Sequence, residues 1–309
     1  RIIAKETIVS LVQLEYSGFA GATVPICSFT LRKDYIAGER GCFIRLSDFP
    51  GTENQGPKTL EAIRNRDCTW FFEAKQDDLE KIPGHLIAYW ALKGLLDGFT
   101  NPGLGTRTKG EGKNVTADND RFLRLHWEVS VKELGRDKKW LLYAKGGSFR
   151  KWCGNLEHVC NWSPEARLHY RQNYSSRIID EEYWYLRGLT WTVISSSTIG
   201  FRLLPANTTF DTKGLTLFFR EKEDLRRALL LTNSVVGQTY LRTINQTFSV
   251  NTEHVKAIPY LLNVNYDNMV LQSLIKFSES DWNAYEHSAV FQSFPLLTAY
   301  FEPKRSLES

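Results

Sequence analysis

Long apolar runs are missing from this sequence. No stretch approaches the roughly 18 to 20 apolar residues that a membrane-spanning helix needs, and no charged N-terminal region precedes an apolar signal core. We therefore expect a cytoplasmic protein with no membrane segment.

Cysteine is scarce, odd in number and scattered along the chain. No two cysteines have the CxxC spacing of a zinc site, and the six histidines form no HExxH motif. We therefore expect reduced thiols and no bound metal. The five cysteines are Cys27, Cys42, Cys68, Cys153 and Cys160.

Motifs of phosphate-loop and hydrolase chemistry are also missing. The glycines between residues 103 and 112 do not form GxxxxGK[ST], and no Ser/His/Asp order of a hydrolase stands out. The segment 101–119 is rich in Gly, Thr and Asn, so we interpret it as a flexible loop.

Methionine occurs once, at Met269, and the chain opens at Arg1 within an apolar-rich run. We therefore interpret the sequence as a piece of a longer protein. With 42% hydrophobic and 24% charged residues, the composition is that of a globular protein. The net charge of +4 permits a polyanionic partner without demonstrating one.

The start of the chain predicts a β-hairpin. Residues 8–16 and 23–31 have strand-like composition, and the small residues 17–22 between them favour a turn. Pro25 would remove a hydrogen-bond donor from a central strand, so this strand either begins there or lies at an edge. We expect the hairpin to flank a sheet whose other strands are missing. Residues 47–57 are rich in Gly, Pro and Asn, and a short helix candidate at residues 58–63 and the aromatic residues 70–72 follow; we interpret this stretch as a linker.

The rest of the chain predicts a second, mixed region. Residues 122–219 contain short β-rich runs, such as residues 189–195 and 216–219, separated by turn residues. Residues 221–244 have the apolar spacing of one long amphipathic helix. Helices and strands alternate without strict βαβ order, which favours an α+β fold, and we expect a domain boundary between about residues 83 and 101.

Several strings of residues resemble one protein family, and they occur in that family's order. They are residues 14–27 (LEYSGFAGATVPIC), 44–49 (IRLSDF), 81–84 (KIPG), 87–90 (IAYW), 118–124 (DNDRFLR), 143–152 (YAKGGSFRKW) and 188–197 (GLTWTVISSS). On these strings the sequence resembles the PglX family of adenine-N6 DNA methyltransferases, which belong to BREX phage-defence systems. The resemblance covers most of the chain and thins beyond residue 259.

The resemblance implies one part of an S-adenosylmethionine-dependent enzyme. The family's cofactor loop and its Asp/Asn-Pro-Pro-aromatic tetrad would lie upstream, and neither occurs here, since residues 101–104 (NPGL) lack the second proline and the aromatic residue. S-adenosylmethionine would therefore be bound by residues absent from this chain, and we expect the chain to be inactive by itself.

The resemblance also implies a domain organisation. Residues 1–50 would be the C-terminal strands of the methyltransferase domain, residues 51–100 a linker with connecting helices, and residues 101–309 the target-recognition domain. The implied α+β fold is the end of an α/β methyltransferase sheet, followed by a mixed, β-rich domain with a long C-terminal amphipathic helix.

An aromatic side chain is needed for the extruded base. An enzyme that methylates adenine N6 takes the base out of the stack, and stacking in the pocket offsets part of that cost. The resemblance implies that Phe19, between Gly18 and Ala20 in the hairpin turn, stacks on the flipped adenine. The alternative is that Phe19 caps the hydrophobic end of the hairpin.

The segment 145–152 combines charge, glycine and aromatic residues. Lys145, Arg150 and Lys151 are predicted to contact DNA phosphates, because glycine-rich backbone allows a close approach. The alternative is a solvated basic turn next to a buried Trp152.

Residues near 120 offer side chains for base readout. Asn119 has the chemistry for adenine, and Arg121 and Arg124 have the bidentate chemistry for guanine. The alternative is that Asp120 pairs with the two arginines. Ala117 stands where the family often has glycine.

Ser196 and Arg202 complete the predicted DNA contacts, because small hydroxyl donors follow a β-rich run here and an arginine lies beyond them. The alternative is packing of a polar strand end.

Double-stranded DNA is thus the expected partner, and target recognition for site-specific adenine-N6 methylation in BREX phage defence is the expected function. The alternative function is a non-catalytic interaction module that binds other BREX proteins or a phage DNA mimic.

Overall fold

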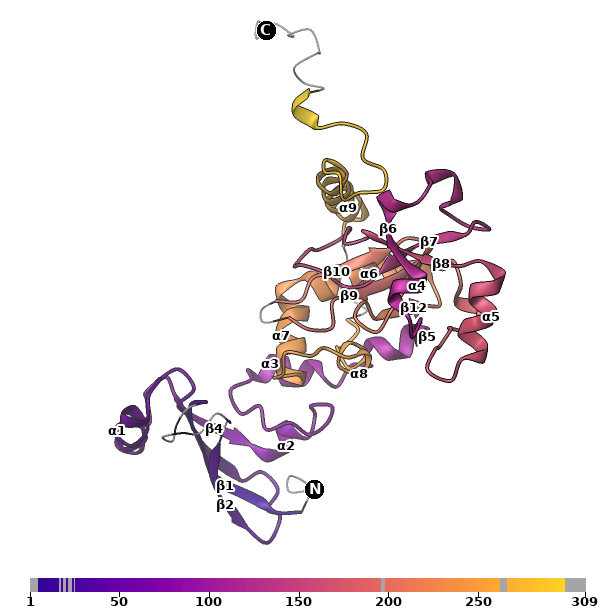
Figure 1. The fold of residues 1–309 in the computed structure, drawn as a ribbon. Helices are drawn as coiled ribbons and strands as arrows, with labels where there is room; N and C mark the ends of the chain where they lie inside the picture. The colour runs from indigo at the N-terminus through magenta and orange to yellow at the C-terminus, as the bar shows by residue number, and fades with distance from the viewer. Residues whose placement is uncertain are drawn as a thin grey trace, which may run out of the picture. The chain divides into compact units, whose positions relative to one another are not determined.

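The computed structural model describes residues 5–16, 18, 21, 24, 26–195, 198–261 and 266–297. The chain divides into two compact units, Arg1–Pro102 and Gly103–Ser309, and each is described here by itself (Figure 1). The mixture of helices with several small sheets confirms the predicted α+β class. Among the described residues, no helix has the length and apolarity needed to cross a membrane.

The first unit is built on one four-stranded sheet with the order β2-β1-β3-β4. β1 and β2 pair antiparallel, with Gln13 opposite Cys27, which confirms the predicted hairpin. β2 begins at Cys27 and lies at the edge of the sheet, as expected; Pro25 itself lies outside the described residues. The strands are β1 (Thr7–Gln13), β2 (Cys27–Arg32), β3 (Arg40–Arg45) and β4 (Phe71–Lys75).

The segment 51–100 was predicted to be a linker with connecting helices, and it differs from that prediction by supplying a strand to the sheet. It contains helices α1 (Thr52–Arg64), α2 (Gln76–Leu79) and α3 (Lys93–Gly98), and it supplies strand β4. β4 joins the sheet because its aromatic residues pair with the apolar β3, with Phe72 opposite Phe43. Tyr89 then stacks on Phe43, with the ring centroids 4.7 Å apart.

The second unit contains two four-stranded sheets, with the orders β10-β9-β12-β5 and β11-β7-β8-β6. Their short strands confirm the predicted β-rich region, and the run at residues 216–219 is strand β12. The strands are β5 (Thr108–Gly112), β6 (Leu123–Leu125), β7 (Trp140–Ala144), β8 (His158–Asn161), β9 (Gly188–Trp191), β10 (Phe201–Leu204), β11 (Thr208–Phe210) and β12 (Thr216–Phe219).

Short helical segments connect and cover these sheets. The α-helices are α4 (Asn119–Phe122), α5 (Pro164–Gln172), α6 (Lys222–Asn233), α7 (Val235–Ile244), α8 (Thr252–Lys256) and α9 (Asn268–Asn283). The 3-10 helices are η1 (Leu104–Arg107), η2 (His126–Glu128), η3 (Val131–Glu133) and η4 (Glu181–Tyr183).

The helix expected over residues 221–244 is interrupted. Ser234 ends α6 and caps α7, because its Oγ accepts a hydrogen bond from Gly237 N at 3.0 Å. The turn is tight: a Cβ on Gly237 would lie 1.9 Å from the carbonyl oxygen of Leu231. The prediction of one long helix was therefore wrong, and Val236, an apolar residue just after the break, is 50% exposed.

Candidate nucleic-acid interface

The loop after β7 carries three of the predicted DNA-binding cations. Gly146 and Gly147 have φ values of 89° and 124°, a left-handed region that favours glycine. This backbone turns the chain sharply, so that Arg150 and Lys151 face helices of their own unit instead of open solvent.

Arg150 and Lys151 both have partners within the protein. Arg150 Nη2 donates to Asp281 Oδ2 on α9 at 2.7 Å, and its guanidinium lies 5.1 Å from the Trp282 ring centroid. Lys151 Nζ donates to the carbonyl oxygen of Asn233 at 2.9 Å, at the end of α6, where the helix dipole favours a cation. A phosphate contact by either side chain therefore stays a prediction and would compete with these bonds.

Lys145 is the remaining cation of this loop. It is half-buried, and among the described residues no carboxylate lies within ion-pair distance of it. The charge of Lys145 affects the pKa of two neighbouring groups. Burial raises the pKa of the Asp211 carboxyl, and Lys145 partly offsets this rise. Burial lowers the pKa of His158, and Lys145 lowers it further.

Arg202 is buried, with 2% of its surface exposed. Its Nη1 donates to the carbonyl oxygen of Arg150 at 3.3 Å, and its Nη2 donates to Thr192 Oγ1 at 3.3 Å. Burial lowers the pKa of the guanidinium to about 10. In this structure the side chain links the 145–152 loop to the sheet, so a DNA contact by Arg202 stays a prediction that would require these bonds to open. Ser196 lies outside the described residues, as does Phe19.

The residues predicted to read bases surround α4. Asp118 caps this short helix by accepting from Arg121 N at 3.0 Å, and the preceding Ala117 has φ of 60°. A left-handed residue at this position is consistent with the glycine that the family often has there. Asn119 is exposed, and its Oδ1 accepts from Thr116 Oγ1 at 2.7 Å.

The two arginines of this segment differ in whether their guanidinium groups already have hydrogen-bond partners. Arg124 donates to the carbonyl oxygens of Asp120 and Leu123, both at 2.6 Å, so its guanidinium is held against the backbone. Arg121 is exposed and lies 4.8 Å from the ring centroid of Phe122. No ion pair joins Asp120 to either arginine, so the alternative of mutual pairing is not what the structure shows for these described residues.

A cluster that sequence reasoning missed lies on α5. Arg167 and Arg171, four residues apart on one helix face, lie 5.1 Å and 5.6 Å from the ring centroid of Trp184. Arg136 lies 5.0 Å from the ring of Tyr185. We call these three arginines and two rings the basic aromatic cluster.

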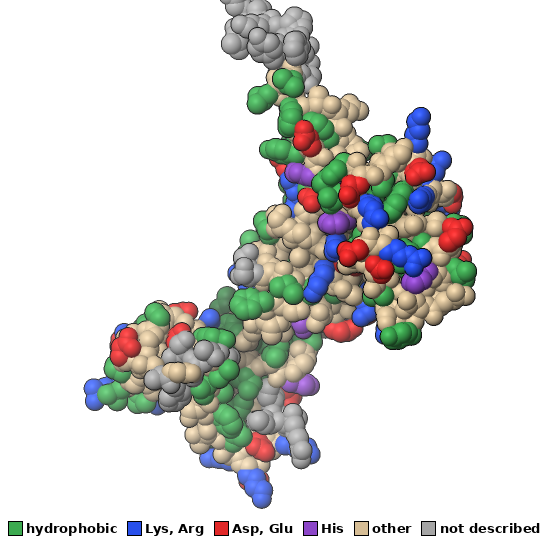
Figure 2. All heavy atoms as spheres, in the orientation of Figure 1, with side chains coloured by type: hydrophobic (Ala, Val, Ile, Leu, Met, Phe, Trp, Pro, Cys, Tyr) green, Lys and Arg blue, Asp and Glu red, His purple; other side chains and the backbone are tan. Residues whose placement is uncertain are grey.

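The basic aromatic cluster is anchored by the core beneath it. Trp184 and Tyr185 pack on the buried residues that include Phe122 and Tyr170, which brings Arg121 to the same part of the unit. Figure 2 shows Lys and Arg side chains gathered over this part of the second unit, with Asp and Glu among them. The four-residue spacing of Arg167 and Arg171 was visible in the sequence, but their aromatic partner lies on another segment.

Side chains that could ligate a metal are spread across the residues that the structure describes. No group of three or more His, Cys, Asp or Glu side chains among them could hold a metal ion. The five cysteines, all described, form no disulfide. The sequence contains neither a methyltransferase cofactor loop nor the tetrad, so we assign S-adenosylmethionine to no cavity of this chain.

Comparison with known proteins confirms the family resemblance. The chain is 30% identical over 309 residues to the adenine-specific methyltransferase PglX of Lacticaseibacillus casei (strain Zhang), covering 94% of this chain and 26% of that protein. It is 28% identical over 306 residues to the adenine-specific methyltransferase BrxX of Escherichia coli O9:H4 (strain HS), covering 96% of this chain and 25% of that protein. The chain thus spans about a quarter of the length of these relatives.

Two solved structures share a weaker likeness. The type IIL restriction-modification enzyme MmeI in complex with DNA aligns with 93% of this chain and 39% of its own, with a TM-score of 0.44 and 9% identity. The type IIG restriction endonuclease BpuSI aligns with 90% of this chain and 39% of its own, with a TM-score of 0.31 and 11% identity. No protein-family profile matches the chain.

Proposed function

Because the chain is similar over most of its length to a segment of the adenine-specific methyltransferases PglX and BrxX, we propose that it supplies DNA target recognition for such an enzyme. The reaction is site-specific adenine-N6 methylation in BREX phage defence, with double-stranded DNA as the partner in the cytoplasm. The alignment itself carries the proposal: the chain matches a quarter of each relative and contains no cofactor loop or catalytic tetrad. We infer that a part of a methyltransferase without these catalytic motifs serves to recognise the DNA target.

The second unit supports this proposal with arginines that lie on aromatic rings. Arg121 is exposed and Arg167 is half-buried, and both combine charge for the phosphate backbone with a planar group that stacks. Arg171 lies on the same ring as Arg167 and is paired with Glu181. S-adenosylmethionine would supply the methyl group and would be bound by residues outside this chain. The chain alone is then expected not to methylate DNA; methyl transfer above background by the purified chain would contradict this.

A segment exchange tests the proposal. In a methyltransferase that carries this chain, residues 101–309 are replaced by the aligned segment of the L. casei relative, and methylated adenines are mapped by sequencing. We expect the methylated sequence to follow the exchanged segment. If the hybrid methylates the original sequence, target recognition lies elsewhere.

Helix α9 favours a second candidate function, a protein-interaction module for other BREX proteins or a phage DNA mimic. Met269, Val270 and Phe277 on this helix are 75%, 52% and 72% exposed, and these apolar side chains would be available to contact a partner protein. Salt-sensitive binding to an acidic protein, together with no binding to duplex DNA, would favour this function.

A further inference from the structure

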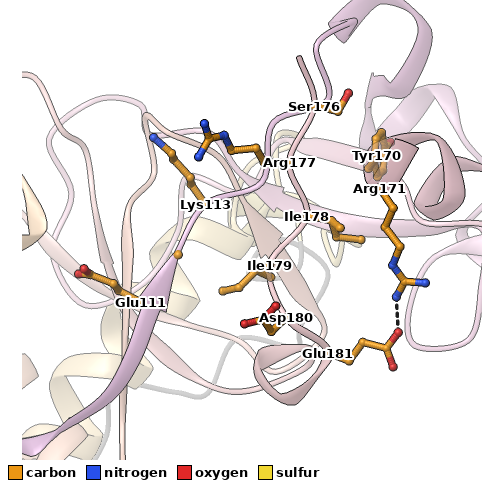
Figure 3. Close-up of a pocket in the computed structure, with 11 residues that line it drawn as sticks. Glu111, Lys113, Tyr170, Arg171, Ser176, Arg177, Ile178, Ile179, Asp180 and Glu181 are labelled. Atoms are coloured by element: carbon orange, nitrogen blue, oxygen red, sulfur yellow. Dashed lines mark hydrogen bonds and ion pairs between the residues drawn. The ribbon is translucent and has the colours of Figure 1, made fainter. Parts of the chain in front are cut away.

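A charged cavity of about 650 Å³ lies beside the basic aromatic cluster (Figure 3). Its walls come from the end of β5, the end of α5 and the segment 176–181. The sequence predicted a flexible loop over residues 101–119, which include the first wall. In the structure, β5 pairs with β12, and Val115 pairs with Arg177.

Two backbone hydrogen bonds hold the walls together. Val115 N donates to Arg177 O at 2.8 Å, and Arg177 N donates to Val115 O at 2.9 Å. Asn114, buried between the walls, accepts from Ile179 N at 2.8 Å and donates to Thr209 Oγ1 at 2.6 Å. These hydrogen bonds therefore hold the walls of the cavity in place.

Half of the charged side chains that line this cavity are paired. Arg171 forms an ion pair with Glu181. Glu111 Oε1 accepts from Lys256 Nζ at 2.9 Å, so its charge is compensated from outside the lining. These pairs leave three charged groups to consider.

The remaining groups are Lys113, Arg177 and Asp180. Lys113 and Arg177 are exposed, and among the described residues neither has a carboxylate within ion-pair distance. Figure 3 shows both side chains pointing to the same end of the cavity, whereas Asp180 lies towards the other end. This end of the cavity thus presents two cations without a counter-charge.

We propose that Lys113 and Arg177 bind a phosphate of duplex DNA at this end of the cavity. The guanidinium offers a planar fork to two phosphate oxygens, and the ammonium adds a point charge. The backbone bonds between Val115 and Arg177 keep the two cations on adjoining segments, so one phosphate could contact both. The inference rests on the proposed function, because it takes DNA as the polyanion, and it adds a contact that positions DNA without reading its sequence.

Salt-dependent binding tests this site in the 309-residue chain. We compare the wild type with K113A/R177A, using fluorescence-anisotropy titrations of cognate and random duplexes at several salt concentrations. Each lost phosphate contact removes about 0.9 from the slope of log affinity against log salt, so loss of this one contact in the double variant should flatten the slope by about 0.9. Affinity for the two duplexes should fall by the same factor.

Two matched variants control for charge and for folding. K222A/K276A removes the same charge from exposed lysines on α6 and α9 that do not line the cavity, and we expect its slope to remain near that of the wild type. K113R/R177K keeps both charges and should keep the slope. Circular dichroism and thermal unfolding confirm that each variant folds.

The outcomes separate this inference from the proposed function. If the wild type binds duplex DNA and K113A/R177A keeps the wild-type slope, the phosphate site is overturned and target recognition still stands. An equal flattening by K222A/K276A also overturns the site, because it shows a general charge effect. If the wild type binds no duplex DNA, both the site and DNA recognition by this chain are overturned.

Discussion

Arg150 and Asp281 form an ion pair that joins the loop after β7 to helix α9, with 2.7 Å between Nη2 and Oδ2. The two residues are 131 positions apart in the sequence. Ser278 strengthens the connection, because its Oγ donates to Lys151 O at 2.9 Å. A phosphate that approached Arg150 would therefore compete with this carboxylate.

Asp281→Asn should release Arg150 for DNA. If Arg150 contacts a phosphate, the salt slope should steepen by about 0.9 and binding should tighten equally for cognate and random duplexes. Anisotropy titrations at several salt concentrations measure both quantities. Glu279→Gln removes the same charge from the same helix without breaking an ion pair among the described residues, and should have a smaller effect. No difference between the two variants would argue that Asp281 does not compete with DNA.

Alanine at Lys145, Arg150 and Lys151 together should flatten the salt slope by roughly 2 to 3, because each phosphate contact contributes about 0.9. The loss should be blind to sequence, since phosphate contacts position DNA without reading it. Thermal unfolding is needed beside the titration, because Lys151 also stabilises the end of α6. An unchanged slope in a folded variant would remove this loop as a phosphate clamp and favour the protein-interaction function.

Arg121→Ala and Arg124→Ala test base readout. If an arginine reads guanine, its replacement should weaken binding to the cognate duplex by about 1 to 3 kcal/mol, and the affinity for random DNA should stay unchanged. The structure favours the larger effect for Arg121, because Arg124 already donates to two backbone carbonyls. Equal losses on cognate and random duplexes would mean that the arginine contacts only the backbone.

Phe19→Ala, made in a methyltransferase that carries this chain, should reduce methylation far more than DNA affinity. Stacking contributes roughly 1 to 3 kcal/mol per base, and here it would act on the extruded adenine alone. Turnover and duplex affinity are measured on the same preparation. Normal turnover by a folded variant would show that Phe19 takes no part in holding the base.

The stability of the chain should fall as the pH drops below about 6.5, the ordinary histidine pKa. Burial lowers the pKa of both His126 and His158, so the unfolded chain takes up protons that the folded chain does not. The unfolded state is therefore favoured as the pH falls through this range. Thermal unfolding between pH 7.5 and pH 5.5 is expected to show a decrease of a few degrees.

Histidine variants identify the source of that decrease. His126→Gln should weaken the pH dependence, because the buried Nε2 atom has no hydrogen-bond partner among the described residues. His85→Gln changes an exposed histidine and should leave it unchanged. A pH profile that is the same in all three proteins would exclude His126 as the cause.

Local signals explain how much of the fold could be predicted. The hairpin of β1 and β2 and the strand at Thr216–Phe219 follow from side-chain patterns within a few residues, and the structure contains both. The helix break at Ser234 was missed because its cause is the close approach of Gly237 to Leu231, which apolar spacing does not encode. The strand β4 was missed because its pairing with β3 is a long-range contact.

The sequence by itself determined the family resemblance, the α+β class and which residues carry charge near candidate DNA contacts. Only the tertiary structure decided which of those charges are free. Arg202 is buried against backbone oxygens and Arg150 is paired with a distant aspartate, whereas Lys113 and Arg177 reach one cavity through the pairing of Val115 with Arg177. The reason is physical: residue type sets the charge of a side chain, but packing between segments far apart in the chain sets its partner and its exposure to solvent.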